Sequence, residues 1–450
     1  MSLTLSPNSG LLPQAVGLHR ETYQKPTAFS FYNFLLADTK NSTARIRAEL
    51  RDALLNNVIY EDPGVQKRLL GQDQTANTAT RISGDDQLVL KIVYKLRADH
   101  KRSLKALKDI ADNADKAEEA RRKKAKGVED QPAPNDRGKK EETAMYPHLA
   151  NIVEIIEQFV VCEQKMVRKD SNQKDGLNYR LIVCYGNKDP EIEDFMLGNA
   201  AFDQKPDFVV AEVPWPEEKE LGKMMHTSSP SLQKGLMWRQ LSAFMELKAS
   251  RLDGPCPATK SYSDIRRTLR QGADYARLIL IARPFQYFVI GCFLCGTDFY
   301  VGWFDRGGIV MSSKYCIEQN DGLAIFVKFV IRLLWEMELQ DLGHHSSAMP
   351  IDDDSTYYGK NYPSLEVVAG TAEEPSLYRW KTVKNPMWTS HSPLLGRGTS
   401  VSWAIRLGLG GQPVMLKSAL RLPGRIGEAE IYRIMAYLFT DKKTGIVIKP

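Results

Sequence analysis

A series of short apolar runs in the middle of the chain constrains the fold more than any other feature. The runs are rich in β-branched and aromatic side chains and too short for buried helices, which is typical of strands. Helical patterns lie before the first run and between the third and the fourth, and Gly296 marks a hairpin between the last two. The order of helix, three strands, helix and strands predicts a small mixed α/β core. The strand-like runs lie at 179–185, 207–213, 243–248, 287–294 and 299–304.

Changes in composition divide the chain into six segments that together predict an α+β protein. Helical spacing of apolar residues indicates a helical N-terminal region, and glycine-rich turns indicate a further small sheet near the C-terminus. The predicted segments are a flexible arm at 1–30, a helical region at 31–112, a charged linker at 113–145, an α/β module at 146–340, an irregular connection at 341–394 and a C-terminal lobe at 395–450.

Composition argues against membrane and secreted classes. The 450 residues are 43% hydrophobic and 26% charged, as in ordinary globular proteins. No apolar stretch approaches the roughly 20 residues that span a bilayer, and no basic segment followed by an apolar run opens the chain. The six cysteines are scattered, which favours free thiols in a reducing compartment. We therefore expect an intracellular protein, cytoplasmic or nuclear, that contacts no membrane.

A basic run at 121–126 has three interpretations. It suits a nuclear localisation signal, a nucleic-acid contact, or a solvated helix end among neighbouring glutamates such as Glu118 and Glu119. The net charge of +6 does not decide among them, because 61 basic residues are balanced by 55 acidic ones. The sequence therefore leaves the partner open between nucleic acid and another protein, and the oligomeric state is open as well.

Two carboxylates and a lysine occur on neighbouring strand-like runs. Asp207 begins one run, and Glu246 and Lys248 end the next. Residues two apart on a strand point to the same face, so Glu246 and Lys248 point together and an adjacent strand can bring Asp207 beside them. Carboxylate oxygens are preferred ligands of hard cations such as Mg²⁺ or Mn²⁺, and a nearby ammonium can orient a water that attacks a phosphodiester.

This pattern resembles the PD-(D/E)xK nuclease superfamily. The resemblance implies a restriction-endonuclease-like core, with Asp207 and Glu246 as metal ligands and Lys248 as the catalytic lysine. Gln271 and Tyr275 match the Q-x-x-x-Y spacing of RecB-like members and would line the site, since residues four apart share one helical face. The alternative is a structural relic of the fold without an intact site.

A glycine-rich turn and a strand lysine follow near the C-terminus. Gly396 and Gly398 precede one predicted strand, and Lys417 lies on the next. In protein kinases this order places glycine backbone over ATP phosphates and pairs the lysine with a glutamate of the following helix. Two residues could be that glutamate, Glu428 and Glu430. Val401 stands where the motif has its third glycine, so the phosphate cradle departs from the pattern.

The order of motifs from 271 onward resembles the fungal-type protein kinase family. The stretch 271–308 carries Q-G-A-D-Y-A-R, R-P-F, G-C-F-L-C-G and W-F-D-R-G-G before the G-R-G-T loop, and the resemblance covers 146–450. It implies the N-lobe of a protein kinase with an ATP-binding remnant. Too few residues follow Lys417 for a catalytic loop and a metal-binding D-F-G motif, so we expect a truncated, pseudokinase-like protein without kinase activity.

Three functional hypotheses follow from these patterns. The first is a fungal-type protein kinase domain-containing protein that is inactive as a kinase. The second is a metal-dependent PD-(D/E)xK-type nuclease that acts on DNA or RNA. The third is a non-catalytic binding or regulatory protein.

Overall fold

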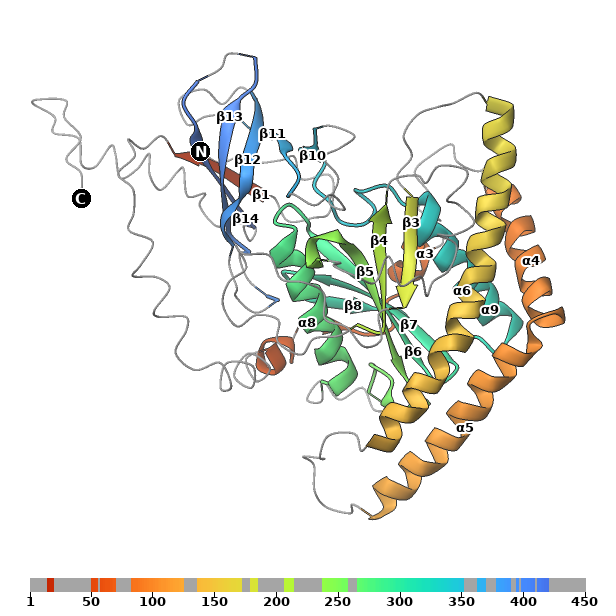
Figure 1. Cartoon of the computed structure of the whole chain (residues 1–450). Helices are drawn as coiled ribbons and strands as arrows, with labels where there is room; N and C mark the ends of the chain where they lie inside the picture. Colours follow the sequence, from red (N-terminus) through yellow and green to blue (C-terminus); the bar gives the residue numbers. More distant parts are fainter. Residues whose placement is uncertain are drawn as a thin grey trace, which may run out of the picture.

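The computed structural model describes most of the α/β module and parts of the flanking segments. The described residues are 14–19, 50–55, 57–69, 82–124, 136–171, 179–184, 206–213, 237–257, 265–351, 362–369, 378–389, 394–395, 398–408 and 411–420. Helices and two sheets make up this part of the chain, which agrees with the predicted α+β class (Figure 1).

A mixed sheet forms the centre of the protein in the order β2-β8-β7-β6-β5-β4-β3, with β9 paired to β7. Most neighbours are antiparallel, but β2 pairs with β8 in parallel, and so does β5 with β6, to which it is joined through α8. The predicted strands and the Gly296 hairpin are confirmed. The strands are β2 (Val58–Ile59), β3 (Tyr179–Cys184), β4 (Phe208–Val213), β5 (Leu241–Lys248), β6 (Phe288–Cys295), β7 (Asp298–Asp305), β8 (Ile309–Met311) and β9 (Tyr315–Cys316).

Helices cover both faces of this sheet because alternate strand residues are apolar on each side. Helix α8 lies on one face, and α4, α5, α6 and α9 lie on the other (Figure 1). Among the described residues, no helix is long and apolar enough to cross a membrane. The helices are α3 (Pro63–Leu69), α4 (Ile82–Ala98), α5 (Lys101–Lys124), α6 (Asp136–Ser171), α8 (Arg267–Ala282) and α9 (Asn320–Ile331).

Helix α8 packs unusually close to the sheet. A Cβ atom added to Gly272 would lie 2.4 Å from the Phe293 ring of β6, so only glycine fits at this contact. The buried residues Leu269, Ala273 and Tyr275 continue the same helix face into the core. This close approach holds α8 against β5 and β6, beside the end of β5.

A second, six-stranded antiparallel sheet has the order β1-β14-β13-β12-β11-β10. Its small core includes Leu365, Trp380, Ala404 and Leu416, together with Phe285 from the loop after α8. Its strands are β1 (Gln14–His19), β10 (Ala348–Pro350), β11 (Leu365–Ala369), β12 (Tyr378–Thr389), β13 (Ser400–Arg406) and β14 (Val414–Leu420).

Three segments differ from the predicted organisation. The described residues of 113–145 are helical in α5 and α6, because buried side chains such as Ala114 and Met145 face the core while the charges face solvent. The expected irregular connection contains β10, β11 and β12, whose alternation was too weak to recognise. In the expected flexible arm, residues 14–19 pair with β14.

Candidate functional site

The sheet register brings the carboxylates of two strands together. Strands β4 and β5 are antiparallel, and Phe208 lies opposite Met245. Extending this register by one residue places Asp207 opposite Glu246. Both side chains are buried, with exposed fractions of 7% and 1%. The expected juxtaposition of Asp207 with the end of β5 is therefore present in the structure.

Lys248 completes this group from the same strand as Glu246. Its Nζ donates a hydrogen bond of 2.6 Å to Glu246 Oε1, because residues two apart on β5 share one face. A second carboxylate, Glu142 of α6, lies 3.6 Å from the same ammonium. The side chains of Glu142 and Lys248 are 19% and 15% exposed, so the group is accessible to solvent on their side.

Asp207 is fixed by two donors. The hydroxyl of Tyr146 on α6 donates to Asp207 Oδ1, and the backbone N–H of Leu247 donates to Asp207 Oδ2 at 2.6 Å. The Tyr146 ring also packs edge-on against Phe208. Helix α6 and strand β5 together therefore set the orientation of this carboxylate.

Burial and like charge perturb the titration of the group. Burial raises the pKa of Asp207, although Lys248 and Tyr146 partly oppose the rise. Burial raises the pKa of Glu246, and the negative charge of Asp207 raises it further. Burial lowers the pKa of Lys248, but the surrounding carboxylates outweigh it, so the net shift is upward and the ammonium stays charged. Strong perturbation of several adjacent groups is typical of functional sites.

Helix α8 contributes the two residues that the sequence had suggested. Gln271 Nε2 donates a 2.6 Å hydrogen bond to the Tyr275 hydroxyl. Burial raises the pKa of Tyr275, and the negative charges of Glu246 and Asp207 raise it further. The i, i+4 pair therefore lies along the α8 side of the group.

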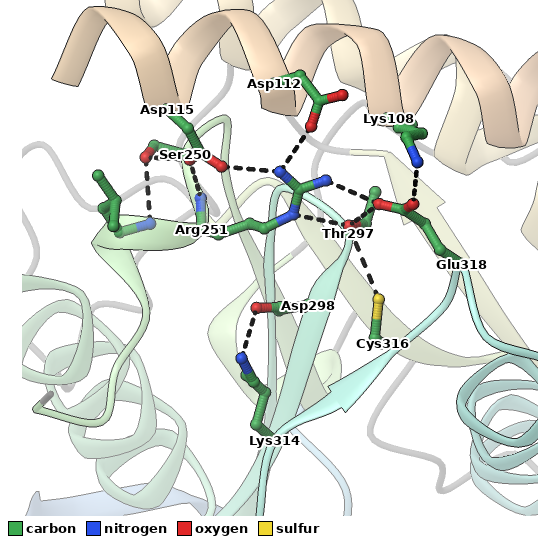
Figure 2. A network of polar contacts seen from close by, with 11 residues as sticks. Lys108, Asp112, Asp115, Ser250, Arg251, Thr297, Asp298, Lys314, Cys316 and Glu318 are labelled. Atoms are coloured by element: carbon green, nitrogen blue, oxygen red, sulfur yellow. Dashed lines mark hydrogen bonds and ion pairs between the residues drawn. The ribbon is translucent and has the colours of Figure 1, made fainter. Parts of the chain in front are cut away.

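An arginine just beyond Lys248 ties the end of β5 to α5. Arg251 Nη1 contacts Asp112 at 2.9 Å and Asp115 at 2.7 Å, and its Nη2 donates to Glu318 at 2.7 Å (Figure 2). The backbone N–H of Arg251 and the hydroxyl of Ser250 also bind Asp115. This network holds α5 next to the carboxylate and lysine group.

Sequence reasoning missed Glu142 and Tyr146. They lie four residues apart and therefore share one face of α6. The available signal was this spacing, followed by the helical pattern at Met145 and Leu149. The surrounding charges obscured it, because the tract resembled a disordered linker.

The predicted nucleotide-binding residues are only partly described. Gly396, Glu428 and Glu430 lie outside the described residues. Lys417 is on β14, opposite Val401 of β13. Gly398 has φ of +51°, and a Cβ at this position would lie 2.7 Å from Arg306 Nε.

The donor set fits a hard divalent cation held mainly by water. Within the described ranges, no group of three or more His, Cys, Asp or Glu side chains is arranged to hold a metal ion. Asp207 and Glu246 supply two carboxylates, and the buried Oε2 of Glu246 has no hydrogen-bond partner in the described part of the chain. Mg²⁺ commonly keeps several waters and binds through one or two carboxylates.

Comparison with known proteins gives one match, which covers less than half of the chain. A family model described as Fungal protein kinase matches residues 228–433, which include β5, α8 and the β13–β14 hairpin but not Asp207. Comparisons with curated proteins and with solved structures found no match. Residues 228–433 of this chain therefore carry a fungal protein kinase family domain.

Proposed function

We propose that the module around the central sheet is a metal-dependent nuclease of the PD-(D/E)xK type. The observation that carries the proposal is the convergence of Asp207, Glu246 and Lys248 at the adjoining ends of β4 and β5. The described order of α6, three strands, α8 and β6 agrees with the core that the resemblance implies. The raised pKa values of both carboxyls give the cluster an electrostatic reason to bind a cation.

Each residue has a chemical role in this proposal. Asp207 and Glu246 would hold a Mg²⁺ or Mn²⁺ ion, which stabilises charge on the phosphoryl oxygens when bound. The charged Lys248 would orient a water towards the scissile phosphodiester. Tyr146 keeps Asp207 oriented through its hydroxyl, and Glu142 shares the ammonium of Lys248.

A second candidate concerns the C-terminal sheet. The family match favours a nucleotide-binding function there, and the β13–β14 hairpin carries Lys417 on a strand that follows the glycine-rich turn. In this candidate the protein binds ATP, or a protein partner, without transferring a phosphoryl group. The two candidates use different lysines on different sheets, so one pair of variants tests both.

Cleavage and nucleotide binding are expected to respond to different lysines. Plasmid DNA and a structured RNA are incubated with purified protein in Mg²⁺ or Mn²⁺, and Lys248→Ala is expected to lower the cleavage rate by about 100-fold or more. Lys417→Ala should leave that rate unchanged. ATP binding measured by calorimetry should be lost in Lys417→Ala and unchanged in Lys248→Ala.

Wild-type protein that nicks neither substrate with any divalent metal would overturn the nuclease proposal. Equal cleavage by wild type and Lys248→Ala would do the same, since contamination would then explain the signal. Circular dichroism spectra of both variants control for loss of the fold. ATP binding that survives Lys417→Ala would exclude the second candidate at that lysine.

A further inference from the structure

The end of α5 carries consecutive cations and contacts the segment that follows β5. Arg121 and Arg122 lie in the last turns of α5, and their side chains are 41% and 39% exposed. Lys123 follows them and is exposed as well. These three residues, 121–123, are here called the α5 basic end.

Direct contacts place the α5 basic end close to the site. Arg122 Nη2 donates a 3.1 Å hydrogen bond to the carbonyl of Leu252, which lies four residues beyond Lys248. Asp253, the residue after Leu252, is influenced by charges of both groups. Burial raises the pKa of Asp253, whereas the positive charges of Lys248 and Arg122 oppose that rise. The Arg251 network holds α5 in this position (Figure 2).

The charge at this end of α5 is not fully neutralised within the helix. Glu118 binds Arg121 at 2.6 Å and Arg122 at 2.9 Å, so one carboxylate serves two guanidinium groups. Glu118 is itself largely buried, with a side chain that is 10% exposed. Both arginine side chains nevertheless remain partly exposed to solvent.

A polyanion that approaches the carboxylates needs such cations. Glu142, Asp207 and Glu246 repel a phosphodiester backbone, and Lys248 alone is already shared between two of these carboxylates. Arginine and lysine on the rim supply the sequence-independent attraction that positions nucleic acid by its phosphates. The planar guanidinium groups are also suited to bidentate phosphate contacts.

We infer that the α5 basic end is the surface that binds the phosphate backbone of a nucleic-acid strand next to the site. The inference rests on the proposed nuclease function and names the residues that hold its substrate. It also assigns a role to the basic run at 121–126, in preference to a merely solvated helix end. Residues 125–126 of that run lie outside the described residues.

The test separates the two ends of one helix. A double variant, Arg121→Gln with Lys123→Gln, removes two cations from the α5 basic end, and Arg122 is left intact because it bonds Leu252. The matched control, Arg102→Gln with Lys105→Gln, removes two exposed cations from the other end of α5, about 30 Å away along the helix.

Binding is measured without metal, by fluorescence anisotropy of labelled single-stranded DNA, duplex DNA and single-stranded RNA over a range of salt concentrations. The double variant at the α5 basic end is expected to bind about tenfold more weakly, with a salt slope smaller by about 2. The control variant should bind like wild type. The three probes show which strand type is preferred.

Equal weakening by both double variants would overturn the inference, because it would indicate diffuse attraction to the whole helix. Absence of metal-free binding by wild type would overturn it too. This measurement does not depend on cleavage. Strong binding without any cleavage would therefore contradict the nuclease proposal but not the assignment of the binding surface. Thermal unfolding of both double variants confirms that the fold is retained.

Discussion

Glu157 is a buried carboxyl on α6 whose charge opposes folding at neutral pH. It is 2% exposed, and its Oε1 accepts a 3.2 Å hydrogen bond from the Ile182 N–H. Burial raises its pKa from 4.5 to about 8, although that N–H favours the charged form. Between pH 4.5 and about 8, Glu157 keeps its proton in the folded protein but loses it in the unfolded chain. The stabilisation from this group is therefore fully present below pH 4.5 and is lost as the pH rises to 8.

Glu157→Gln should reduce the pH dependence of stability. Between pH 4.5 and 8 the variant is expected to lose roughly 3 kcal/mol less unfolding free energy than wild type. Chemical denaturation at several pH values measures this, with Glu119→Gln, an exposed glutamate on α5, as the control. Parallel pH profiles for wild type and Glu157→Gln would contradict the assignment. Asp207 and Glu246, whose pKa values are also raised, contribute to the pH dependence that persists in the variant.

At the scale of elements, α5 and α6 form an antiparallel pair that carries residues to the site. Helix α6 supplies Glu142 and Tyr146, and α5 is tied to the sheet through Arg251. Burial raises the pKa of Glu318, but hydrogen bonds from Lys108, Thr297 and Arg251 hold it down to about 2. The Glu318 carboxyl of this network therefore stays charged at neutral and mildly acidic pH.

Arg251→Met should loosen α5 while keeping most of the side-chain volume. Loss of four charged or polar contacts from one guanidinium is expected to lower the unfolding free energy by roughly 2 to 3 kcal/mol. Hydrogen exchange should increase along α5. The control, Arg379→Met, removes an exposed pair with Glu366 and should leave the unfolding free energy nearly unchanged. Unchanged protection of α5 in Arg251→Met would show that apolar packing alone holds the helix.

At the scale of the whole molecule, Leu394 and Gly398 connect the segment before β13 to the central module. Leu394 is fully buried in the core on the α8 face, and its carbonyl accepts a 3.4 Å hydrogen bond from Arg306 Nη1. Gly398 then lies directly against the same guanidinium. The family match includes strands of both sheets, and residues 306, 394 and 398 all lie within it.

Gly398→Ala is expected to destabilise the protein more than Gly408→Ala. Both glycines have positive φ, +51° and +88°, so both alanines strain the backbone. Only at position 398 would the added Cβ also meet Arg306, since nothing lies within 4 Å at position 408. In thermal or chemical unfolding, Gly398→Ala should lower the unfolding free energy by about 1 to 3 kcal/mol more than Gly408→Ala does. Equal costs would mean that the turn is not held against Arg306.

Much of the central architecture could be predicted because its signals are local. Short β-branched runs and a glycine at the hairpin specified the strands β3 to β7, and helical spacing specified α8. The helices across 113–145 were not recognised because their charged faces dominate the composition. Strands β10 to β12 were not predicted because the second sheet has a small core, so its strands need little alternation of apolar and polar residues.

In the candidate site, too, some features follow from the sequence alone and others only from the tertiary structure. Spacing along the chain by itself determined that Glu246 and Lys248 share a face and that Gln271 and Tyr275 share a helical face. Only the tertiary structure decided that Asp207 lies opposite Glu246 and that Glu142 approaches Lys248 from α6. The physical reason is that side-chain direction follows local backbone geometry, whereas the pairing of distant segments depends on how their apolar faces are buried together.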